Sequence, residues 1–453
     1  MANGFLYSDL SGANTFKKQA VLMAVCGGLL CGVAQAEPVL ATADQQALDA
    51  RTINIDRRNV FPLLRAQASL AYVTAYGLAL TSEASSRLGN ALDELEVSAI
   101  QKAVNNDPQY PKVYWLNAPP REWFGLKVEG GRYSFDNPDN IYRTIPIDGG
   151  SSYVIQGRRF GSGPTDVTFS LIKNPNSQQT IAVLTGDQLV VKPDGSYTVT
   201  VDNQPANGRI NHIQSTGEAV QLFVRNNLGD WNTETPDTLS VTRLGTPTRG
   251  PRSDADVVAD TRTNLSESAL FYGVGTLGVK TYINPLNTLA QPSTSDTLGT
   301  LVTQASSFGH FRLADDEALI ATVNLGGARY FVFPVTDPWS VSVDPIRHQS
   351  SLNNKQAVPN ADGSYTFVLS VADPGVTNWI DPVGLHEGTI MARWQNLPAT
   401  TPATGGPAIA TRVVKLRDLA AYLPTDTRYV TPAQRAQQLQ ERAAGYARRL
   451  ATQ

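Results

Sequence analysis

Two periodicities of apolar residues alternate along the chain. Between residues 60 and 104, apolar side chains such as Leu64, Ala68 and Tyr72 recur every three or four positions, which predicts amphipathic helices. Across residues 113–247, apolar and polar positions alternate in short runs separated by Gly, Pro, Asn and Asp, which predicts β-strands joined by turns. The alternation resumes after residue 300. The pattern therefore predicts a helical segment followed by a β region, twice in succession.

Two helix starts stand out further along the chain. Ser253, with Asp256 three residues later, has the spacing of a capping box, in which two side chains bond the first free backbone amides of a helix. Thr431 followed by Pro432 has the signature of an N-cap and a first helical residue. The helix after Pro432 carries only a narrow apolar stripe, so we expect it to lie on the surface of a larger body.

The pentapeptide Asp-Gly-Ser-Tyr-Thr occurs twice, at residues 194–198 and 362–366. In both copies Gly permits the positive φ of a turn and Tyr begins an alternating strand, so each copy predicts a β-hairpin. The same offset places Arg225 of "QLFVR" on Arg393 of "TIMAR". Two matches at one offset indicate a duplicated β module; the alternative is that the pentapeptide is a common hairpin sequence.

These patterns predict a mainly β protein with flanking α-helices. We expect two antiparallel jelly-roll-like sandwiches in tandem, with helical N-terminal, central and C-terminal segments. The predicted boundaries are a signal peptide at 1–36, a helical N-terminal segment at 37–112, a first β-sandwich at 113–247, a helical segment and linker at 248–300, a second β-sandwich at 301–422 and a C-terminal helix at 423–453.

The N-terminus has the three parts of a secretory signal peptide. Lys17 and Lys18 precede the apolar run "AVLMAVCGGLLCGVA", and "AQA" at residues 34–36 is a small-x-small cleavage site. We expect residues 1–36 to be removed and the protein to be periplasmic or secreted; an uncleaved N-terminal anchor is the alternative. Both cysteines lie in this segment, so the processed chain is predicted to have no disulfide and no Cys-based zinc site.

Composition and residue spacing exclude several classes of function. Apolar residues make up 41% of the chain and charged residues 17%, which supports packed cores. The net charge is −3 and no basic stripe occurs, so nucleic acid is not an expected partner. No later apolar run is long enough to cross a bilayer, and the four histidines lack zinc-ligand spacing. We therefore expect that the processed protein binds no metal and no cofactor and that it is not an integral membrane protein.

Strings in both halves resemble two bacterial families. The second half contains "DPWSVSVDP" at residues 337–345 and "ADPGVTNWIDPVGLHEGTIMARW" at 372–394, and it is similar to the domain of unknown function twelve-fourteen. The first half contains "DNPDNIYRTIPID" at 136–148 and "LGDWNTETPDTLSVTRL" at 228–244, and it is similar to the frequent partner of that domain, twelve-fifty-four.

This resemblance covers most of residues 60–450. It departs from the family pattern at "IRHQSSLNN", where a Tyr or Asn is expected ahead of the Arg. The resemblance implies helices joined to jelly-roll-like β domains in an exported or envelope-associated protein. It implies no particular reaction.

A polar stretch, "FDNPDNIYR", marks the beginning of the first β region. It places carboxylates, amides, a phenol and a guanidinium at one loop-to-strand junction. These groups can bind a polyol or a carboxylate, or supply oxygen ligands to a hard cation; the alternative is turn chemistry around Pro138. The predicted ligand-binding residues here are Asp139, Asn140, Tyr142 and Arg143.

A second polar stretch, "DPGVTNWIDPVGLHEG", lies in the second β region. An acid beside a His can perform general acid–base catalysis, and a Trp can stack on a sugar or a lipid ring. The alternative is a structured loop in which the Trp plugs the end of the β domain. The predicted ligand-binding residues are Asn378 and Trp379, and the catalytic candidates are Asp373, Asp381, His386 and Glu387.

Arg393 completes the set of predicted ligand-binding residues. If its strand is regular, it shares a face with Met391. A buried Arg needs a counter-charge, for which Asp381 and Asp373 are the predicted partners, unless it lines a cleft and pairs with an anionic ligand. Arg225 takes the matching place in the first copy of the repeat.

Two functional hypotheses follow. The first is a cell-envelope protein that binds a small polar or amphiphilic ligand, or a glycan, in a cleft between the β domains where Asp139, Tyr142, Trp379 and Arg393 meet. The second is a cofactor-independent hydrolase or lyase that uses an Asp–His pair in the same cleft. A His386 side chain that reaches an acid of its own loop inside a cavity favours the enzyme, and an exposed His386 favours binding.

Overall fold

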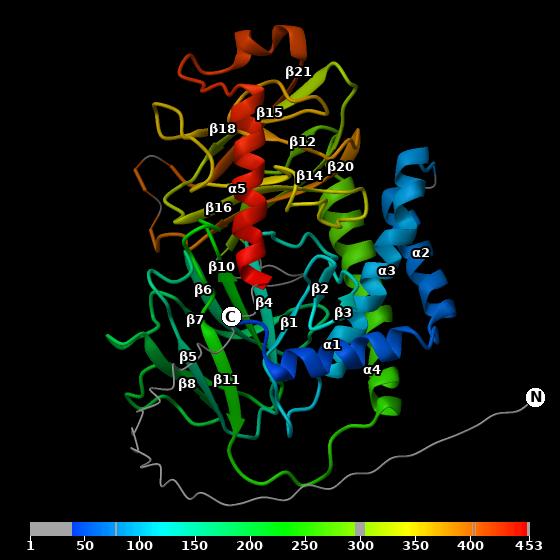
Figure 1. Cartoon of the computed structure of the whole chain (residues 1–453), viewed down its shortest axis with the longest axis vertical. Coiled ribbons are helices and arrows are strands. Elements are labelled where there is room, and N and C mark those ends of the chain that lie inside the picture. Colours follow the sequence, from blue (N-terminus) through cyan, green and yellow to red (C-terminus); the bar gives the residue numbers. More distant parts are fainter. Residues whose placement is uncertain (1–38, 78, 295–303, 401, 404, 451–453) are drawn as a thin grey trace, which may run out of the picture. The chain divides into compact units, whose positions relative to one another are not determined.

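Antiparallel β-sheets dominate the protein and helices flank them, as the apolar pattern predicts. The computed structural model (Figure 1) describes residues 39–77, 79–294, 304–400, 402–403 and 405–450. The predicted signal peptide, residues 1–36, lies outside the described residues. The described residues belong to one compact unit.

The first β region forms two sheets. One has the strand order β1-β4-β10-β6-β7 and the other has the order β11-β5-β8-β9. Neighbouring strands are antiparallel except β8 and β9, which are parallel. The bounds are β1 (Tyr114–Leu116), β4 (Asn140–Pro146), β5 (Tyr153–Arg158), β6 (Asp166–Ile172), β7 (Thr180–Thr185), β8 (Ser196–Asp202), β9 (His212–Gln214), β10 (Gln221–Asn227) and β11 (Thr238–Arg243). A small hairpin joins β2 (Arg121–Trp123) to β3 (Leu126–Val128).

The second β region also forms two sheets. Their strand orders are β12-β14-β20-β16-β17, with β13 paired to β14, and β19-β18-β15-β21. Here β18 and β19 are the parallel pair. The bounds are β12 (Thr288–Leu289), β13 (Ser293–Thr294), β14 (Gln304–Arg312), β15 (Glu317–Asn324), β16 (Tyr330–Thr336), β17 (Ser351–Asn353), β18 (Tyr365–Leu369), β19 (Trp379–Ile380), β20 (Glu387–Gln395) and β21 (Ala408–Lys415).

The two β regions have the same strand order. The sheet β4-β10-β6-β7 corresponds to β14-β20-β16-β17, and the sheet β11-β5-β8-β9 corresponds to β21-β15-β18-β19. The parallel pair recurs at the same place in both. The repeated pentapeptide also falls on corresponding strands, with Tyr197 buried in β8 and Tyr365 buried in β18. A shared order of this kind is what a duplicated β module produces.

The Asp-Gly turns in front of β8 and β18 do not join hairpin strands, contrary to the sequence-based expectation. Gly195 and Gly363 do have the expected positive φ, 84° and 83°. However, β8 pairs with β5 and β9, and β18 pairs with β15 and β19. Each of these strands lies inside a sheet and must bond along both edges, and neither partner is the segment that precedes the turn.

Each β region buries a core between its two sheets. In the first, Ile155 of β5 and Phe169 of β6 belong to one cluster. In the second, Phe367 of β18 and Trp394 of β20 belong to another. Because side chains alternate between the faces of a strand, the outer faces of these sheets remain available for contacts with other elements.

A helical layer lies beside the sheets (right-hand side of Figure 1). It consists of α1 (Ala43–Asp56), α2 (Pro62–Tyr76), α3 (Ser82–Val104), α4 (Asp254–Ser268) and the π-helix η1 (Ala269–Tyr282). The layer and both β regions share a hydrophobic cluster, to which Leu95 of α3, Tyr272 of η1 and Trp339 contribute. The predicted capping box is formed by Ser253 and Asp256 at the start of α4.

The C-terminal helix α5 (Pro432–Leu450) follows a short 3₁₀ helix, η2 (Leu416–Tyr422). Gln434 N–H donates to Thr431 Oγ1 at 3.3 Å, as expected of the predicted N-cap. The helix crosses both β regions, because Arg442 Nη2 donates to Ser351 Oγ at 2.8 Å and Arg449 Nη1 donates to Pro138 O at 2.6 Å. It therefore lies on a larger body, as its narrow apolar stripe predicts.

Candidate functional site

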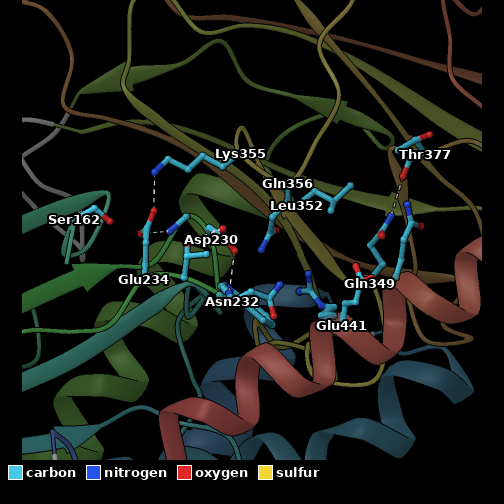
Figure 2. Close-up of a pocket in the computed structure, with 15 residues that line it drawn as sticks. Ser162, Asp230, Asn232, Glu234, Gln349, Leu352, Lys355, Gln356, Thr377 and Glu441 are labelled. Atoms are coloured by element: carbon cyan, nitrogen blue, oxygen red, sulfur yellow. Dashed lines mark hydrogen bonds and ion pairs between the residues drawn. The ribbon is translucent and has the colours of Figure 1, made fainter. Parts of the chain in front are cut away.

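A cleft of about 600 Å³ opens between the two β regions and α5 (Figure 2). Its walls come from parts of the chain that are distant in sequence: the loop 229–234 after β10, the stretch 349–356 around β17, and one face of α5. Ser162 and Thr377 complete the lining. The cleft is therefore formed only when both β regions and the C-terminal helix have assembled.

Glu234 fixes one wall of the cleft. Its buried carboxylate accepts hydrogen bonds from Gly229 N at 2.8 Å and from Thr165 N at 2.9 Å, so it holds the two ends of the loop together. Lys355 Nζ, from the second β region, lies 2.6 Å from Glu234 Oε1. Figure 2 shows this ion pair spanning the cleft wall. The pair ties the two β regions together at this point.

Asp230 orders the rest of the same loop. Its carboxylate accepts from Asn232 N at 2.9 Å and from Thr233 Oγ1 at 2.7 Å. Burial alone would raise the pKa of Asp230, but these hydrogen bonds lower it below the ordinary value. The loop therefore presents a fixed, ionised carboxylate and its neighbouring polar side chains towards the cleft.

Trp231 lines the cleft, but its ring is already covered. The guanidinium groups of Arg442 and Arg449 lie 4.2 Å and 4.4 Å from the ring, and Tyr446 packs against it edge-on at 5.7 Å. Burial lowers the pKa of Arg442 to about 10, so it stays charged at neutral pH. Trp231 thus anchors α5 through cation–π contacts and offers no open face on which a ligand ring can stack.

Uncharged polar side chains outnumber the charged ones in the lining of the cleft. Amides and hydroxyls can both donate and accept hydrogen bonds, which suits a ligand that carries several hydroxyl or carbonyl groups. Leu352 adds an apolar patch to the lining. The uncharged polar residues of the lining are Ser162, Asn232, Thr233, Gln349, Gln356, Thr377 and Gln438.

Asp139 and Arg143, two of the predicted ligand-binding residues, are structural. Asp139 is fully buried and accepts hydrogen bonds from Trp231 Nε1 at 2.8 Å, Tyr330 OH at 2.7 Å and Asn353 Nδ2 at 2.8 Å. Arg143 is buried in the first β region, where it donates to the backbone carbonyl of Asp237 at 2.5 Å. Neither lines the cleft. The polar junction "FDNPDNIYR" joins the two β regions by hydrogen bonds.

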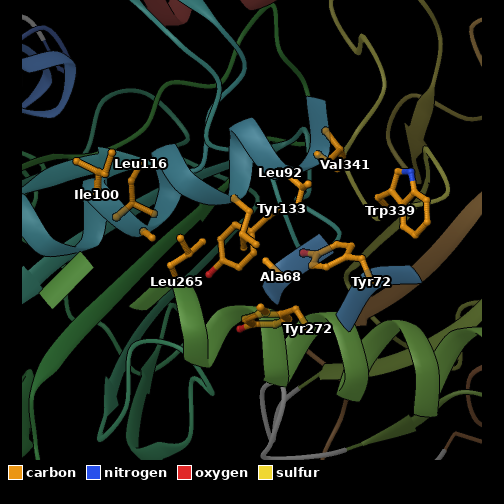
Figure 3. Close-up of a cluster of buried hydrophobic side chains, with 14 of the residues drawn as sticks. Ala68, Tyr72, Leu92, Ile100, Leu116, Tyr133, Leu265, Tyr272, Trp339 and Val341 are labelled. Atoms are coloured by element: carbon orange, nitrogen blue, oxygen red, sulfur yellow. The ribbon is translucent and has the colours of Figure 1, made fainter. Parts of the chain in front are cut away.

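Asn140, Tyr142 and Arg393 line a second, much smaller cavity of about 30 Å³. Arg225 also lines it, so the two arginines that the repeat aligns lie at one place. Tyr133 forms another part of the wall and packs edge-on against Tyr272 of η1 at 5.1 Å, as Figure 3 shows. We call this cavity the chamber.

Asn378 and Trp379 lie elsewhere in the second β region. Asn378 Nδ2 donates to Val358 O at 2.8 Å, and Trp379 Nε1 donates to Ser370 O at 2.9 Å. Both side chains are buried, and the guanidinium of Arg435 from α5 covers the Trp379 ring at 5.2 Å. The expected meeting of Asp139, Tyr142, Trp379 and Arg393 in one cleft is therefore not formed; only Tyr142 and Arg393 share a cavity.

The acids among the catalytic candidates have separate partners. Asp373 pairs with Arg435 of α5 at 2.9 Å. Asp381 Oδ2 lies 2.8 Å from His348 Nδ1. The carboxylate of Glu387 bonds Arg312 Nη2 at 2.8 Å and also binds Tyr76 and Thr81. Burial would raise the pKa of Glu387, but its hydrogen bonds lower it below the ordinary value.

His386 pairs with acids from outside its own loop. Its Nε2 lies 3.0 Å from Asp315 Oδ1 and its Nδ1 lies 3.2 Å from Glu83 Oε2, and these carboxylates raise its pKa. The side chain is 45% exposed. The pairing of His386 with Asp373, Asp381 or Glu387 that would favour the enzyme is thus not formed, because the extended loop between β18 and β20 places neighbours in sequence at separate points of the module.

Arg393 likewise lacks the carboxylate partner that the sequence predicted. It donates to the backbone carbonyls of Met391, at 3.2 Å, and of Phe135. Asp381 and Asp373 are engaged by His348 and Arg435 instead. Arg393 lies on the outer face of β20, which turns towards the first β region and away from those acids.

Metal and membrane signals are absent from the part of the chain that the structure describes. Within the described ranges, no group of three or more His, Cys, Asp or Glu side chains is placed to hold a metal ion. Over the same residues, no helix is long and apolar enough to span a membrane.

The comparisons with known proteins show the fold alone. No family model matches the chain, and no curated protein matches it. The crystal structure of an uncharacterized protein from Burkholderia cenocepacia is similar, with a TM-score of 0.67 at 22% identity over 82% of this chain and 99% of that chain. The crystal structure of the VPA0106 protein from Vibrio parahaemolyticus aligns over 78% of this chain and 100% of that chain at 10% identity, with a TM-score of 0.42.

The sequence predicted a cleft between the β domains but not the residues that line it, and it gave no sign of one buried hub. The signal for the lining is the string "GDWNTE", because an acid–aromatic–amide run between two strands is typical of an ordered polar loop. Asp49 of α1 is fully buried and bonds Arg121 Nη2, Tyr114 OH and Trp123 Nε1, all at 2.9 Å. Asp49 is one of three acids in α1, and nothing in the sequence around it indicates such a role.

Proposed function

We propose that this protein is an exported cell-envelope protein that binds a small polar or amphiphilic ligand, or a glycan, in the cleft between its two β regions and α5. The cleft of about 600 Å³ carries the proposal. Its volume lies within the range of about 300–1,000 Å³ that is usual for small-molecule sites. Its lining of amides and hydroxyls beside Leu352 matches a ligand with both polar and apolar parts.

The proposal extends to location and fold family. The lysines, apolar run and small-residue site at the N-terminus support export. The equal strand orders and the core between each pair of sheets support two jelly-roll-like sandwiches in tandem. The strings in both halves support membership in the families of domains twelve-fifty-four and twelve-fourteen.

Binding is favoured over hydrolysis or elimination by an Asp–His pair. Among the described residues that line the cleft there is no histidine. His348, which pairs with Asp381, directly precedes the lining residue Gln349, but neither member of the pair lines the cleft. A general base must reach the proton that it abstracts, so this geometry supports a binding site.

The ligand class is tested by untargeted binding. The processed protein is incubated with cell-envelope and growth-medium extracts, and retained or consumed compounds are identified by mass spectrometry. We expect a polyhydroxylated or amphiphilic compound to be retained unchanged. Consumption of the compound with release of products would support the enzyme instead, and no retained compound would contradict the proposal.

A matched pair of substitutions on α5 tests the place of binding. Gln438 lines the cleft, whereas Gln440 is exposed on the same helix and does not. Gln438→Ala is expected to weaken binding of the retained compound about fivefold, the value of one hydrogen bond of about 1 kcal/mol. Gln440→Ala is expected to leave binding and the unfolding midpoint unchanged. Gln438 Oε1 also accepts from Arg435 Nη1 at 2.8 Å, so the affinities are compared at a temperature at which both variants are folded. Equal affinities for the two variants would place the site elsewhere.

A further inference from the structure

The chamber lies where the outer faces of β10 and β20 meet. Arg225 is in β10, between β4 and β6, and Arg393 is in β20, between β14 and β16. These are corresponding strands of the two β regions, so the repeat brings two equivalent arginines to one cavity. Two residues further along, Asn227 Nδ2 donates to Gln395 Oε1, which again joins equivalent positions.

Both arginines are buried without a carboxylate partner. Each is 5% exposed. Arg225 donates to Gln178 Oε1 at 3.0 Å and to Ser170 Oγ at 3.4 Å, and Arg393 donates only to the two backbone carbonyls named above. A guanidinium has five N–H donors, so several on each side chain have no acceptor among the described residues. Burying such charges without a counter-charge is unfavourable.

Asp136 faces the chamber but is not ion-paired with either arginine. Its Oδ2 is buried and has no hydrogen-bond partner among the described residues, and it forms no ion pair with either guanidinium. Burial, with the nearby charge of Glu94, raises the pKa of Asp136 well above its ordinary value, although the charges of Arg132 and Arg393 act to lower it; the net direction favours the neutral acid. A neutral Asp136 can donate its own proton into the chamber.

Tyr142 supplies a further donor. Its hydroxyl oxygen accepts from Asn137 N at 3.0 Å, which leaves the hydroxyl proton free to be donated. The chamber therefore combines two cationic groups with neutral O–H donors in a buried setting. This is the donor arrangement that a bound anion requires.

We propose that the chamber is a binding site for one small monovalent anion, of halide or formate size, held jointly by Arg225 and Arg393. A cavity needs about 10–15 Å³ to hold one water molecule. The chamber of about 30 Å³ accommodates an ion of this size and is too small for a sugar or a phosphate ester. The anion supplies the missing counter-charge and couples the two β regions. This site is separate from the cleft and does not depend on the function proposed for it.

Bromide identifies the site directly, because it scatters anomalously and has the size and charge required. Crystals of the processed protein are grown with bromide as the only halide. We expect an anomalous peak in the chamber within hydrogen-bond distance of both guanidinium groups. A map with no such peak would overturn the proposal whatever the variants below do.

Thermal unfolding measures the effect in solution. Chloride, bromide and formate are each compared with gluconate, which is too large for the chamber, at equal ionic strength. We expect the small anions to raise the unfolding midpoint saturably, by about 2–4 °C. Equal midpoints in all four salts would contradict the proposal.

Four single variants assign the effect to the chamber. Arg225→Gln and Arg393→Gln are expected to lose the dependence on small anions. Asp136→Asn is expected to keep it, because Asp136 acts as a neutral donor. The control Arg347→Gln removes a positive charge from a side chain that is 81% exposed, and it should also keep the dependence. A dependence that survives in Arg393→Gln would place the anion elsewhere; if that variant does not fold, the bromide map decides.

Discussion

Equivalent positions of the two β regions hold very different side chains. Asn226 of β10 and Trp394 of β20 correspond under the repeat, and both are fully buried. Asn226 Oδ1 accepts hydrogen bonds from Arg143 and from Asp237 N at 3.1 Å. The Trp394 ring instead packs on Phe331 at 4.8 Å, and its Nε1 donates to Asn324 O at 2.9 Å.

The neighbouring core residues differ in the same way, polar in the first β region and aromatic in the second. In the first β region, the buried carboxylate of Asp237 accepts from Tyr197 OH at 2.8 Å and from Arg159 at 3.2 Å. In the second, Tyr365 packs with the ring of Phe367 at 6.3 Å and its hydroxyl reaches only a backbone carbonyl at 3.3 Å. One strand order therefore accepts either a polar network or an aromatic cluster, provided that buried polar groups are bonded and buried volume is filled.

Among the buried polar groups, Lys102 is expected to have the largest effect on the free energy of unfolding. It belongs to α3 and is buried against the first β region and α4, where Nζ donates to Asn176 Oδ1 and to Ser268 Oγ, both at 3.1 Å, and burial lowers its pKa to about 7. Between pH 7 and about 10.5 the unfolded chain binds this proton and the folded chain does not, so folding stability rises with pH across that window. Below pH 7 both states bind the proton and the dependence ends.

The measurement is urea unfolding of the parent and of Lys102→Met from about pH 6 to about pH 10. The parent should gain stability relative to the variant, by an upper value of roughly 5 kcal/mol, as pH rises through the window. Lys127→Met, at a side chain that is 71% exposed, should show a constant difference. A constant difference for Lys102→Met as well would mean that Lys102 titrates normally.

Trp394→Ala tests the aromatic side. The substitution removes a fully buried ring and leaves a cavity between the sheets, so we expect a loss of about 3–5 kcal/mol in the free energy of unfolding. Trp394→Phe keeps most of the packing and should lose clearly less. Denaturant unfolding measures both, and similar losses would show that the bond to Asn324 O, rather than volume, stabilises this core.

Asp237→Asn tests the polar network of the first β region, in which Asp237 is as fully buried as Trp394 is in the second. It removes the charge that Arg159 and Tyr197 bond while keeping the shape, so we expect a loss of about 1.5–3 kcal/mol. The same unfolding experiment applies, with Asp344→Asn, a half-buried acid that pairs with Arg347, as the control. No loss in Asp237→Asn would mean that the network acts through packing alone.

Asn227 and Gln395 test the contact between the two regions, and the expected effect is the smallest. Their side chains bond each other across the interface. A double-mutant cycle of Asn227→Ala and Gln395→Ala is expected to give a coupling free energy of about 0.5–1.5 kcal/mol. A coupling of zero would mean that the two regions are held together by other contacts, such as the pair of Glu234 with Lys355.

Local patterns predicted much of the fold. The caps at Ser253 and Thr431 mark true helix starts, and strands form where apolar and polar residues alternate along the sequence. The repeated pentapeptide predicted that the two β regions would have corresponding strands. It did not predict their partners, because a strand sequence encodes which face is buried but not which of several distant strands supplies the ladder.

The candidate site depended far more on tertiary contacts. Asp373, Asp381, His386 and Glu387 are close in sequence, yet each pairs with a residue at least 33 positions away. Arg225 and Arg393 are 168 positions apart and share one cavity. Sequence proximity is therefore a poor guide to chemistry here, because an extended loop separates neighbours while sheet packing joins distant strands.

By itself, the sequence determined the spacing of apolar residues in each segment, the positions of the helix caps and the presence of a repeat. These properties depend on interactions within a few residues. The tertiary structure alone decided that loop 229–234, the stretch 349–356 and α5 enclose a cleft and that two arginines meet in the chamber. Those outcomes depend on how the outer faces of the sheets pack, and that packing is a property of the whole chain.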